Sequence, residues 1–237
     1  MNKLISFEFR NAFKLLYIKL LPVILLAFGI SCGFLNDSNN DSTFDGLCQI
    51  IVMMSELITI IGGMLLSKDY TQNTIRNKII VGHSRTKIYL AKQIILTVIY
   101  LLNITAFYAG YTISTALAAG TAQLNRSGLI QSTCYIFVTY FCLSLLACFL
   151  TMTVKNALGG ALPLLAAYAA LMITVFEDLT DAKIMHYVCD TLPLAKLMVC
   201  TCSEPYPHIL RSCILMTCFG IACFTGGIAI FRKTNLN

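Results

Sequence analysis

Six long apolar runs alternate with short polar segments along the chain. They cover residues 15–35, 47–67, 93–119, 129–152, 161–176 and 209–231. Most are near the length of about 20 residues that an α-helix needs to cross the hydrocarbon core of a bilayer. Backbone N–H and C=O groups in lipid must find partners within the segment itself, as they do in a helix. The pattern therefore predicts one all-α integral membrane domain, residues 1–237, with six transmembrane helices.

Polar segments beside these runs complete the predicted architecture. Residues 1–14 are expected to form an N-terminal interfacial helix, because five apolar side chains share one helical face: Leu4, Ile5, Phe9, Ala12 and Phe13. Lys3, Arg10 and Lys14 would then reach water or anionic headgroups. A cleaved signal peptide is the alternative interpretation, but five further apolar runs follow the first. Residues 177–208, the longest polar connection, are expected to form an external loop.

Composition and charge define the class of protein and its expected orientation. Hydrophobic residues make up 57% of the chain and charged residues only 12%, against about 25% charged residues in a typical soluble domain. The 17 Lys and Arg residues lie on the side of the N-terminus except for Arg126, Lys183, Lys196 and Arg211. Cytosolic loops of membrane proteins carry such an excess. Both termini are therefore predicted to be cytosolic, and the net charge of +6 needs no nucleic-acid partner.

The segment between the second and third apolar runs, Lys68–Lys92, carries six of the Lys and Arg residues. Neither Pro nor Gly interrupts residues 71–81, which predicts a short helix. Three isoleucines share one face of this helix and three polar residues point away from it: Ile75, Ile79 and Ile80, and Arg76, Asn77 and Lys78. Gly82 allows the helix to end. A short amphipathic helix beside the membrane is a docking surface for another protein, with Ile75 and Ile79 as the expected contacts.

The order of residues within this segment is also informative. It runs Asp69-Tyr70, then Thr74-Ile75-Arg76-Asn77-Lys78-Ile79, then Gly82-His83-Ser84-Arg85, then Ile88-Tyr89-Leu90-Ala91-Lys92. This order resembles the loop between the second and third spans of ABC-2 type permeases, above all the small six-span permease subunits of bacterial ABC exporters. The resemblance is close over residues 69–92 and extends elsewhere only as a pattern of spans and loops. Asn73 stands where the family usually has Gly.

The resemblance implies that residues 74–80 form a cytosolic coupling helix that docks into a separate ATPase subunit. Asp69 and Tyr70 would form the elbow into the second span, and residues 82–87, with Gly82 and Arg85, the elbow into the third. It further implies two permease chains, two ATPase subunits that bind ATP and Mg, and a bacterial cytoplasmic membrane. No Gly-x-x-x-x-Gly-Lys-Ser/Thr loop occurs in this chain, so no cofactor is expected in it. The implied substrate is a bacteriocin-like peptide or a hydrophobic antibiotic, for export or self-immunity.

Glu56 is the one acidic residue inside a predicted span. A charged side chain at the centre of a bilayer costs about 2.5–3.5 kcal/mol on insertion scales, so such residues face protein or water. Glu56 is therefore either a group that faces the transport pathway or a structural residue, protonated or paired with Ser or Thr. The sequence leaves both interpretations open.

Three pairs of small residues predict close helix packing within the membrane. Each pair is spaced four positions apart: Ala116 and Gly120, Ala166 and Ala170, Ala222 and Gly226. Small side chains at this spacing let the backbones of two helices approach each other closely.

Eight of the 11 cysteines lie in apolar runs, where cysteine packs as a small apolar residue. The others, Cys189, Cys200 and Cys202, are outside, and the sequence leaves open whether Cys189 forms a disulfide with one of the pair. A membrane thiol-redox enzyme is the alternative, but such enzymes use the spacing Cys-x-x-Cys. His186 and His208 add no diagnostic zinc-ligand spacing, so no metal site is expected. The predicted spans contain no His and one acid, so catalytic residues are not expected, and an ATPase-independent channel or carrier is the other alternative.

Overall fold

A computed structural model describes residues 2–37, 45–72, 74–118, 126–154, 161–179, 188–189, 191–192 and 209–233 of the chain. All the secondary structure in these ranges is helical, which confirms the predicted all-α class. The helices are α1 (Asn2–Ala12), α2 (Leu16–Asp37), α3 (Asp45–Thr71), α4 (Thr74–Ile80), α5 (Arg85–Ala118), α6 (Arg126–Val154), α7 (Leu162–Leu179) and α9 (Ile209–Lys233).

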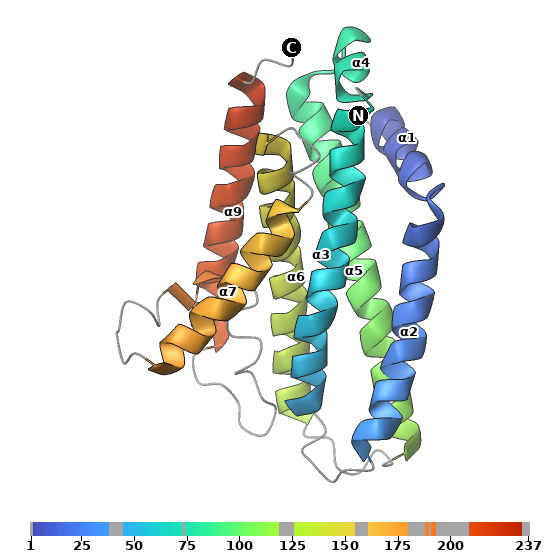
Figure 1. Ribbon diagram of the computed structural model, residues 1–237, viewed down its shortest axis with the longest axis vertical. Helices are drawn as coiled ribbons and strands as arrows, with labels where there is room; N and C mark the ends of the chain where they lie inside the picture. The colour runs from blue at the N-terminus through green and yellow to red at the C-terminus, as the bar shows by residue number, and fades with distance from the viewer. Residues whose placement is uncertain are drawn as a thin grey trace.

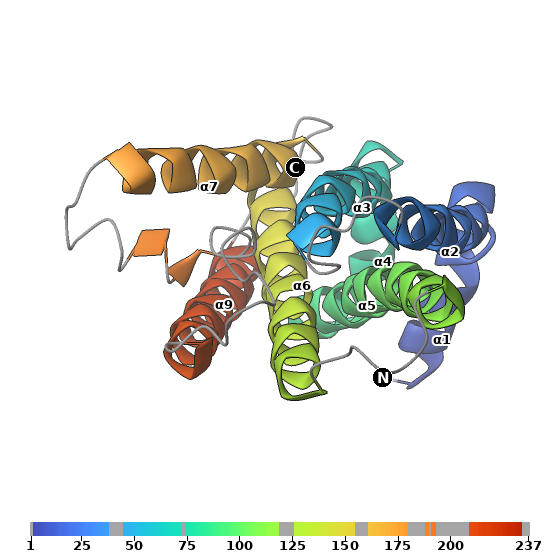
Figure 2. The same ribbon diagram turned by 90° about the horizontal axis from the view of Figure 1, so that it is seen from below.

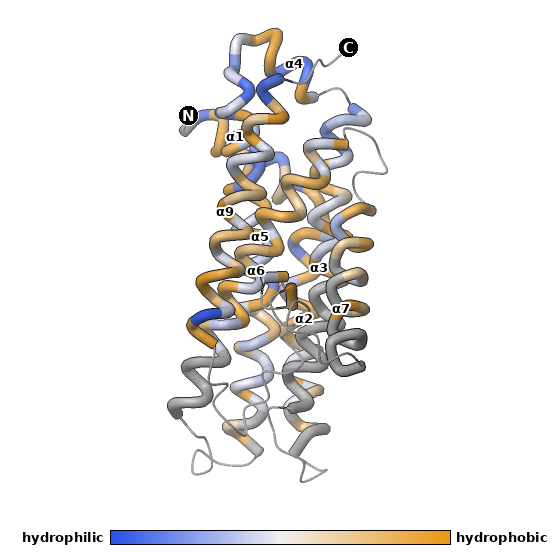
Figure 3. Tube along the Cα trace, turned by 90° about the vertical axis from the view of Figure 1, so that its left-hand side faces the viewer, coloured by the Kyte–Doolittle hydropathy of each residue, from blue (hydrophilic) through white to orange (hydrophobic). Residues whose placement is uncertain are grey.

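Five long helices stand side by side in one bundle: α2, α3, α5, α6 and α9 (Figures 1 and 2). The helix α7 is tilted against this bundle at its outer side. The short helices α1 and α4 lie at one end of the bundle, where α9 also ends (Figure 1). Polar residues gather at this α4 end, whereas the middle of the bundle is largely apolar (Figure 3).

Four helical stretches within the described residues are long and apolar enough to cross a membrane. They are Leu16–Phe34, Arg85–Ser114, Thr133–Val154 and Ile209–Lys233. Large apolar side chains on their outer faces are exposed, Val23 on α2 and Leu210 on α9 among them. A membrane-embedded chain is thus supported, because lipid is the solvent that such faces require. The second and fifth predicted spans correspond to α3 and α7, and the total of six stays a prediction.

The helices α2 and α5 approach each other most closely through glycines. A methyl group on Gly29 would collide with the carbonyl oxygen of Phe107, and one on Gly110 with that of Leu26. A methyl group on Gly33 would collide with the side chain of Ser114. Gly29 and Gly33 thus form the small-x-x-x-small face of α2 that lets two backbones touch.

This contact involves other residues than the three pairs predicted from the sequence. Ala116 and Ala222, two of the small residues expected at helix contacts, are exposed in the single chain. A methyl group added at Gly226 would meet only the ring of Phe149, at an ordinary 3.7 Å. Gly120 lies outside the described residues, as do the side chains around Ala170. Among the described residues, Gly29 and Gly33 have this spacing and lie at a close helix contact.

The helix α9 packs on the bundle through one continuous stripe. Its buried residues are Ser212, Met216, Gly220, Cys223, Gly227 and Phe231. Near the α4 end the ring of Tyr89 on α5 fits against this stripe, with its centroid 6.1 Å from that of Phe231. A methyl group on Gly227 would collide with the Tyr89 hydroxyl. The start of α5 and the end of α9 are therefore fixed to each other.

Candidate functional site

Local hydrogen bonds define both ends of helix α4. The Thr74 hydroxyl donates to Asp69 Oδ1 at 2.6 Å, which ties the first residue of α4 to the end of α3. At the other end the amide of Gly82 donates to the carbonyl oxygen of Ile79 at 2.9 Å, and the amide of His83 to that of Lys78 at 3.1 Å. Gly82 has φ of 96°. These paired bonds and the left-handed glycine form a Schellman motif, which confirms the predicted helix end.

The faces of α4 differ from those predicted. Ile75 is only 2% exposed and belongs to the hydrophobic core, and Ile79 packs against the same core. Lys78, expected to point into water, is buried. Ile80 is 74% exposed, and Val81 next to it 77%. Ile75 therefore packs in the chain's own core, whereas Ile79 is partly exposed, and the role of both residues in coupling stays a prediction.

The accessible face of α4 can be defined from the same burial pattern. It consists of Arg76, Asn77, Ile80 and Val81, and it is called the α4 face below. Arg76 and Asn77 can donate hydrogen bonds, and Ile80 and Val81 offer exposed apolar surface. This composition suits contact with a groove on another protein. The inner face of α4, with Ile75 and Lys78, serves the chain's own packing.

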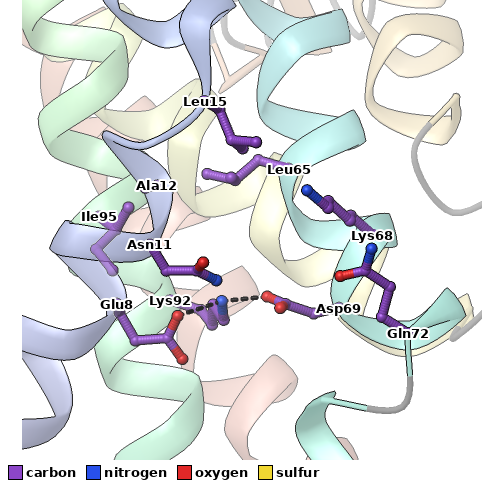
Figure 4. Close-up of a pocket in the computed structure, with 10 residues that line it drawn as sticks. All are labelled: Glu8, Asn11, Ala12, Leu15, Leu65, Lys68, Asp69, Gln72, Lys92 and Ile95. Atoms are coloured by element: carbon purple, nitrogen blue, oxygen red, sulfur yellow. Dashed lines mark hydrogen bonds and ion pairs between the residues drawn. The ribbon is translucent and has the colours of Figure 1, made fainter.

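Two carboxylates and two ammonium groups form a buried cluster behind α4. Glu8 pairs with Lys78, and Lys92 Nζ donates to the other oxygen of Glu8 at 2.6 Å. Lys92 also pairs with Asp69, and Lys78 Nζ lies 4.0 Å from Asp69 Oδ1. Figure 4 shows Lys92 between the two carboxylates. Each of the four side chains is at most 10% exposed, and their formal charges cancel.

This charge cluster joins four helices that are separate in sequence. Glu8 comes from α1, Asp69 from α3, Lys78 from α4 and Lys92 from α5. A buried charge is tolerated only when it is paired and hydrogen-bonded. Loss of one member leaves a charge without compensation, which costs about 3–5 kcal/mol. The cluster therefore favours one arrangement of the four helices over others.

The N-terminal helix packs on protein rather than presenting its apolar face outward. Leu4 on α1 forms a small hydrophobic cluster with Ile88 and Ala91 of α5, against which Ile79 of α4 also packs. Ala12 lies in a second cluster with Leu65 and other residues of α3 and α5. The exposed face of α1 carries Lys3, Phe7 and Arg10, and Lys14 in the following turn is exposed as well. The predicted helix is present, but its apolar face contacts the bundle.

The two elbows around α4 are also held in place. At the end of α3 the Tyr70 hydroxyl donates to the carbonyl oxygen of Met152 on α6 at 3.1 Å. Burial raises the pKa of Tyr70, so this phenol stays protonated and remains a donor. At the start of α5, Arg85 Nη1 donates to the carbonyl oxygen of Arg232 on α9 at 3.1 Å. The segments on either side of α4 are therefore bonded to two further helices of the bundle, α6 and α9.

A small cavity opens beside the charge cluster. Its lining combines the cluster with apolar and amide side chains, namely Glu8, Asn11, Ala12, Leu15, Leu65, Lys68, Asp69, Gln72, Lys92 and Ile95 (Figure 4). Its volume of about 20 Å³ has room for one water molecule. The cavity is too small for a transported molecule or a nucleotide.

The remaining predicted site residues lie elsewhere. Glu56 is within α3, and its side chain is outside the described part of the structure. Cys189 is buried, with its Sγ 3.9 Å from the carbonyl oxygen of Ile173. Cys200 and Cys202 are outside the described residues, so the question of a disulfide stays open. Where the structure is described, no three His, Cys, Asp or Glu residues lie close enough together to hold a metal ion.

Sequence reasoning missed Glu8, although a signal was present. Positions 4, 8 and 12 form one stripe of α1, and Glu8 is the acidic residue between Leu4 and Ala12. An acid within an apolar stripe indicates a buried partner of opposite charge. What the sequence did not indicate was which of the 17 basic residues would be that partner.

The comparisons with known proteins do not extend this account. No protein-family model matches the chain. The search of the curated proteins finds no significant match either. The function is therefore argued from the α4 end of the bundle and from the resemblance of residues 69–92.

Proposed function

We propose that the chain is the permease subunit of an ATP-driven ABC exporter. In this proposal two permease chains form the translocation pathway, and each contacts a separate ATPase subunit through the α4 face. Both termini and α4 lie in the cytosol of a bacterium, and the chain spans the cytoplasmic membrane six times. The transported substrate is a bacteriocin-like peptide or a hydrophobic antibiotic.

One observation carries the proposal: a short helix with an accessible outer face is anchored to the bundle on its inner side. The outer side chains Ile80 and Val81 are free to contact a partner. On the inner side Ile75 is buried in the core, Lys78 pairs with Glu8 of α1 and lies near Asp69 of α3, and Ile79 packs against α5. A partner that moves α4 must therefore also move the helices to which α4 is attached. A lever between an energy source and a transmembrane bundle requires this combination.

The energy source in this proposal is on another polypeptide. ATP and Mg bind to the ATPase subunits, since the chain has no phosphate-binding loop of the Gly-x-x-x-x-Gly-Lys-Ser/Thr type. This chain then has no catalytic residue of its own and acts as the moving part. The alternative, an ATPase-independent channel or carrier, leaves the α4 face without a role.

The test is co-purification of an ATPase with the chain from the cells that make it. The wild-type protein, extracted in mild detergent, is expected to bring down ATPase subunits in equal number. The double variant Ile80→Asp with Val81→Asp places two carboxylates on the α4 face and is expected to lose them. Lys3→Asp with Arg10→Asp is the control, because it puts two carboxylates on exposed positions of α1 at the same end of the bundle.

Two outcomes would count against the proposal. Wild-type protein that carries no ATPase chain would favour the channel or carrier. An unchanged yield of ATPase with the double variant would remove the α4 face from the interface. Variants at Ile75 or Ile79 are unsuitable for this test, because Ile75 is buried and Ile79 packs against the core, so that substitutions there also disturb the fold.

A further inference from the structure

Glu8 is the point at which the N-terminal helix is fixed to α4. One carboxylate oxygen of Glu8 pairs with Lys78 on α4, and the other accepts a hydrogen bond from Lys92 on α5. The Glu8 side chain is 1% exposed, so bulk solvent screens these bonds little. Beside it Ile79 of α4 packs against Leu4 of α1 and Ile88 of α5. Ionic and apolar contacts thus fix the same pair of helices.

The helix α1 is in turn continuous with the start of α2. The three residues between the two helices keep backbone hydrogen bonds, from Phe13 N to Phe9 O at 2.9 Å and from Leu15 N to Ala12 O at 3.0 Å. The Ile18 amide then donates to the carbonyl oxygen of Leu15 at 3.2 Å. The rings of Phe9 and Phe13 stack across the junction, with centroids 6.0 Å apart. A turn bonded in this way transmits displacement from one helix to the next.

We propose that Glu8 is a positioning residue that makes α1 and α4 one mechanical unit. A protein bound to the α4 face then moves the start of α2, as well as α3 and α5, which adjoin α4 in sequence. The start of α2 is about 60 residues from α4 along the chain. The contacts of α1 join the two, in addition to the packing of Ile18 of α2 against Leu65 of α3 and Ile95 of α5. Physical transmission between distant sites requires such a chain of packed and bonded groups.

The arrangement of the charges makes this link separable from the rest of the cluster. Lys92 keeps Asp69 as a partner when Glu8 is neutral, so α3 and α5 remain paired. Lys78 keeps only Asp69 Oδ1, at 4.0 Å. Neutralising Glu8 therefore loosens α1 and α4 selectively.

Amide hydrogen exchange of the full chain in lipid nanodiscs measures the link. In Glu8→Gln, exchange in residues 2–12 and 74–80 is expected to be faster by about tenfold or more, because local opening no longer breaks a buried ion pair. Exchange in α9, residues 209–233, is expected to stay unchanged. Arg10→Gln is the matched control: it removes one charge from the same helix, but from its exposed face.

A double-mutant cycle separates a link from two independent effects. Lys78→Gln is expected to accelerate exchange in α4, and Glu8→Gln with Lys78→Gln to accelerate it no further than Glu8→Gln alone. If Glu8→Gln does not fold, Lys78→Gln alone tests the link between α1 and α4, because Glu8 then still pairs with Lys92. Additive effects on α4 would overturn the inference. So would unchanged exchange in α4, or acceleration throughout the bundle, which indicates general destabilisation.

The consequence for transport rests on the proposed function, whereas the link between α1 and α4 does not. The exchange measurement contains no ATPase, so failure of one proposal is distinguishable from failure of the other. With the ATPase present, ATP is expected to accelerate exchange at the start of α2 in the wild-type chain. Glu8→Gln is expected to retain the bound ATPase and its hydrolysis of ATP, but to show a smaller acceleration there. Loss of ATPase binding in Glu8→Gln would contradict the positioning role.

Discussion

At the scale of single residues, Lys92 holds the α4 end of the bundle together. It is the only member of the charge cluster that lies within 3 Å of both carboxylates. Because the cluster is buried, water and salt screen these interactions little, in contrast to ion pairs on a surface. The effect of the cluster on stability is therefore better expressed as the free energy lost when one member is removed than as the free energy gained when the cluster forms.

We predict that Lys92→Met destabilises the protein by about 3–5 kcal/mol, because Glu8 and Asp69 are left with too little positive charge. The measurement is the thermal unfolding midpoint of the purified protein in detergent, together with the yield of monodisperse protein. Arg76→Met is the control: it removes a charge from the exposed face of α4, where substitutions cost within about 0.5 kcal/mol. Equal midpoints for the two variants would contradict the prediction.

The residue scale also shows where sequence reasoning succeeds. The end of α4 at Gly82 was predictable, because a glycine after a run of helix-compatible residues is a local signal. The pairing of Glu8 with Lys78 was not, because the two residues are 70 positions apart. The burial of Ile75 was missed for a similar reason. Periodicity identifies an apolar face, but it does not say whether that face packs against the chain itself or against a partner.

At the scale of helices, the contact between α2 and α5 depends on the absence of side chains. Gly29 and Gly110 place backbone against backbone, and each leaves no room for a methyl group. Membrane helices have little hydrophobic driving force for association, because lipid is as apolar as their side chains. Close van der Waals packing then provides most of the attraction between them.

Because of this packing, replacement of glycine by alanine is expected to have different effects on stability at Gly29 and at Gly226. Gly29→Ala forces the new methyl group against the carbonyl oxygen of Phe107, so the helices must separate, at a cost of about 1–3 kcal/mol. Gly226→Ala meets only the Phe149 ring at 3.7 Å and is expected to be neutral or slightly stabilising, since Ala favours a helix over Gly. Thermal unfolding midpoints in detergent compare the two variants. A tolerated Gly29→Ala would contradict the close approach of α2 and α5.

At the scale of the whole molecule, the structure places α4 and the C-terminal end of α9 at the same end of the bundle. The bond from Arg85 Nη1 to the carbonyl oxygen of Arg232 connects the turn after α4 directly to that end. The side of the membrane on which the C-terminus lies therefore also locates α4. The excess of Lys and Arg at this end favours the cytosol.

We therefore predict that an epitope fused after Asn237 is hidden in intact cells and accessible in inside-out vesicles. An epitope inserted at residue 40, in the acidic segment between the first two predicted spans, is expected to behave in the opposite way. Antibody binding to both preparations measures both positions, and the second epitope controls for vesicle integrity. Detection of the C-terminal epitope on intact cells would put the α4 face outside the cell, where no cytosolic ATPase reaches it. That result would leave the helix bundle as described and remove the basis of the exporter proposal.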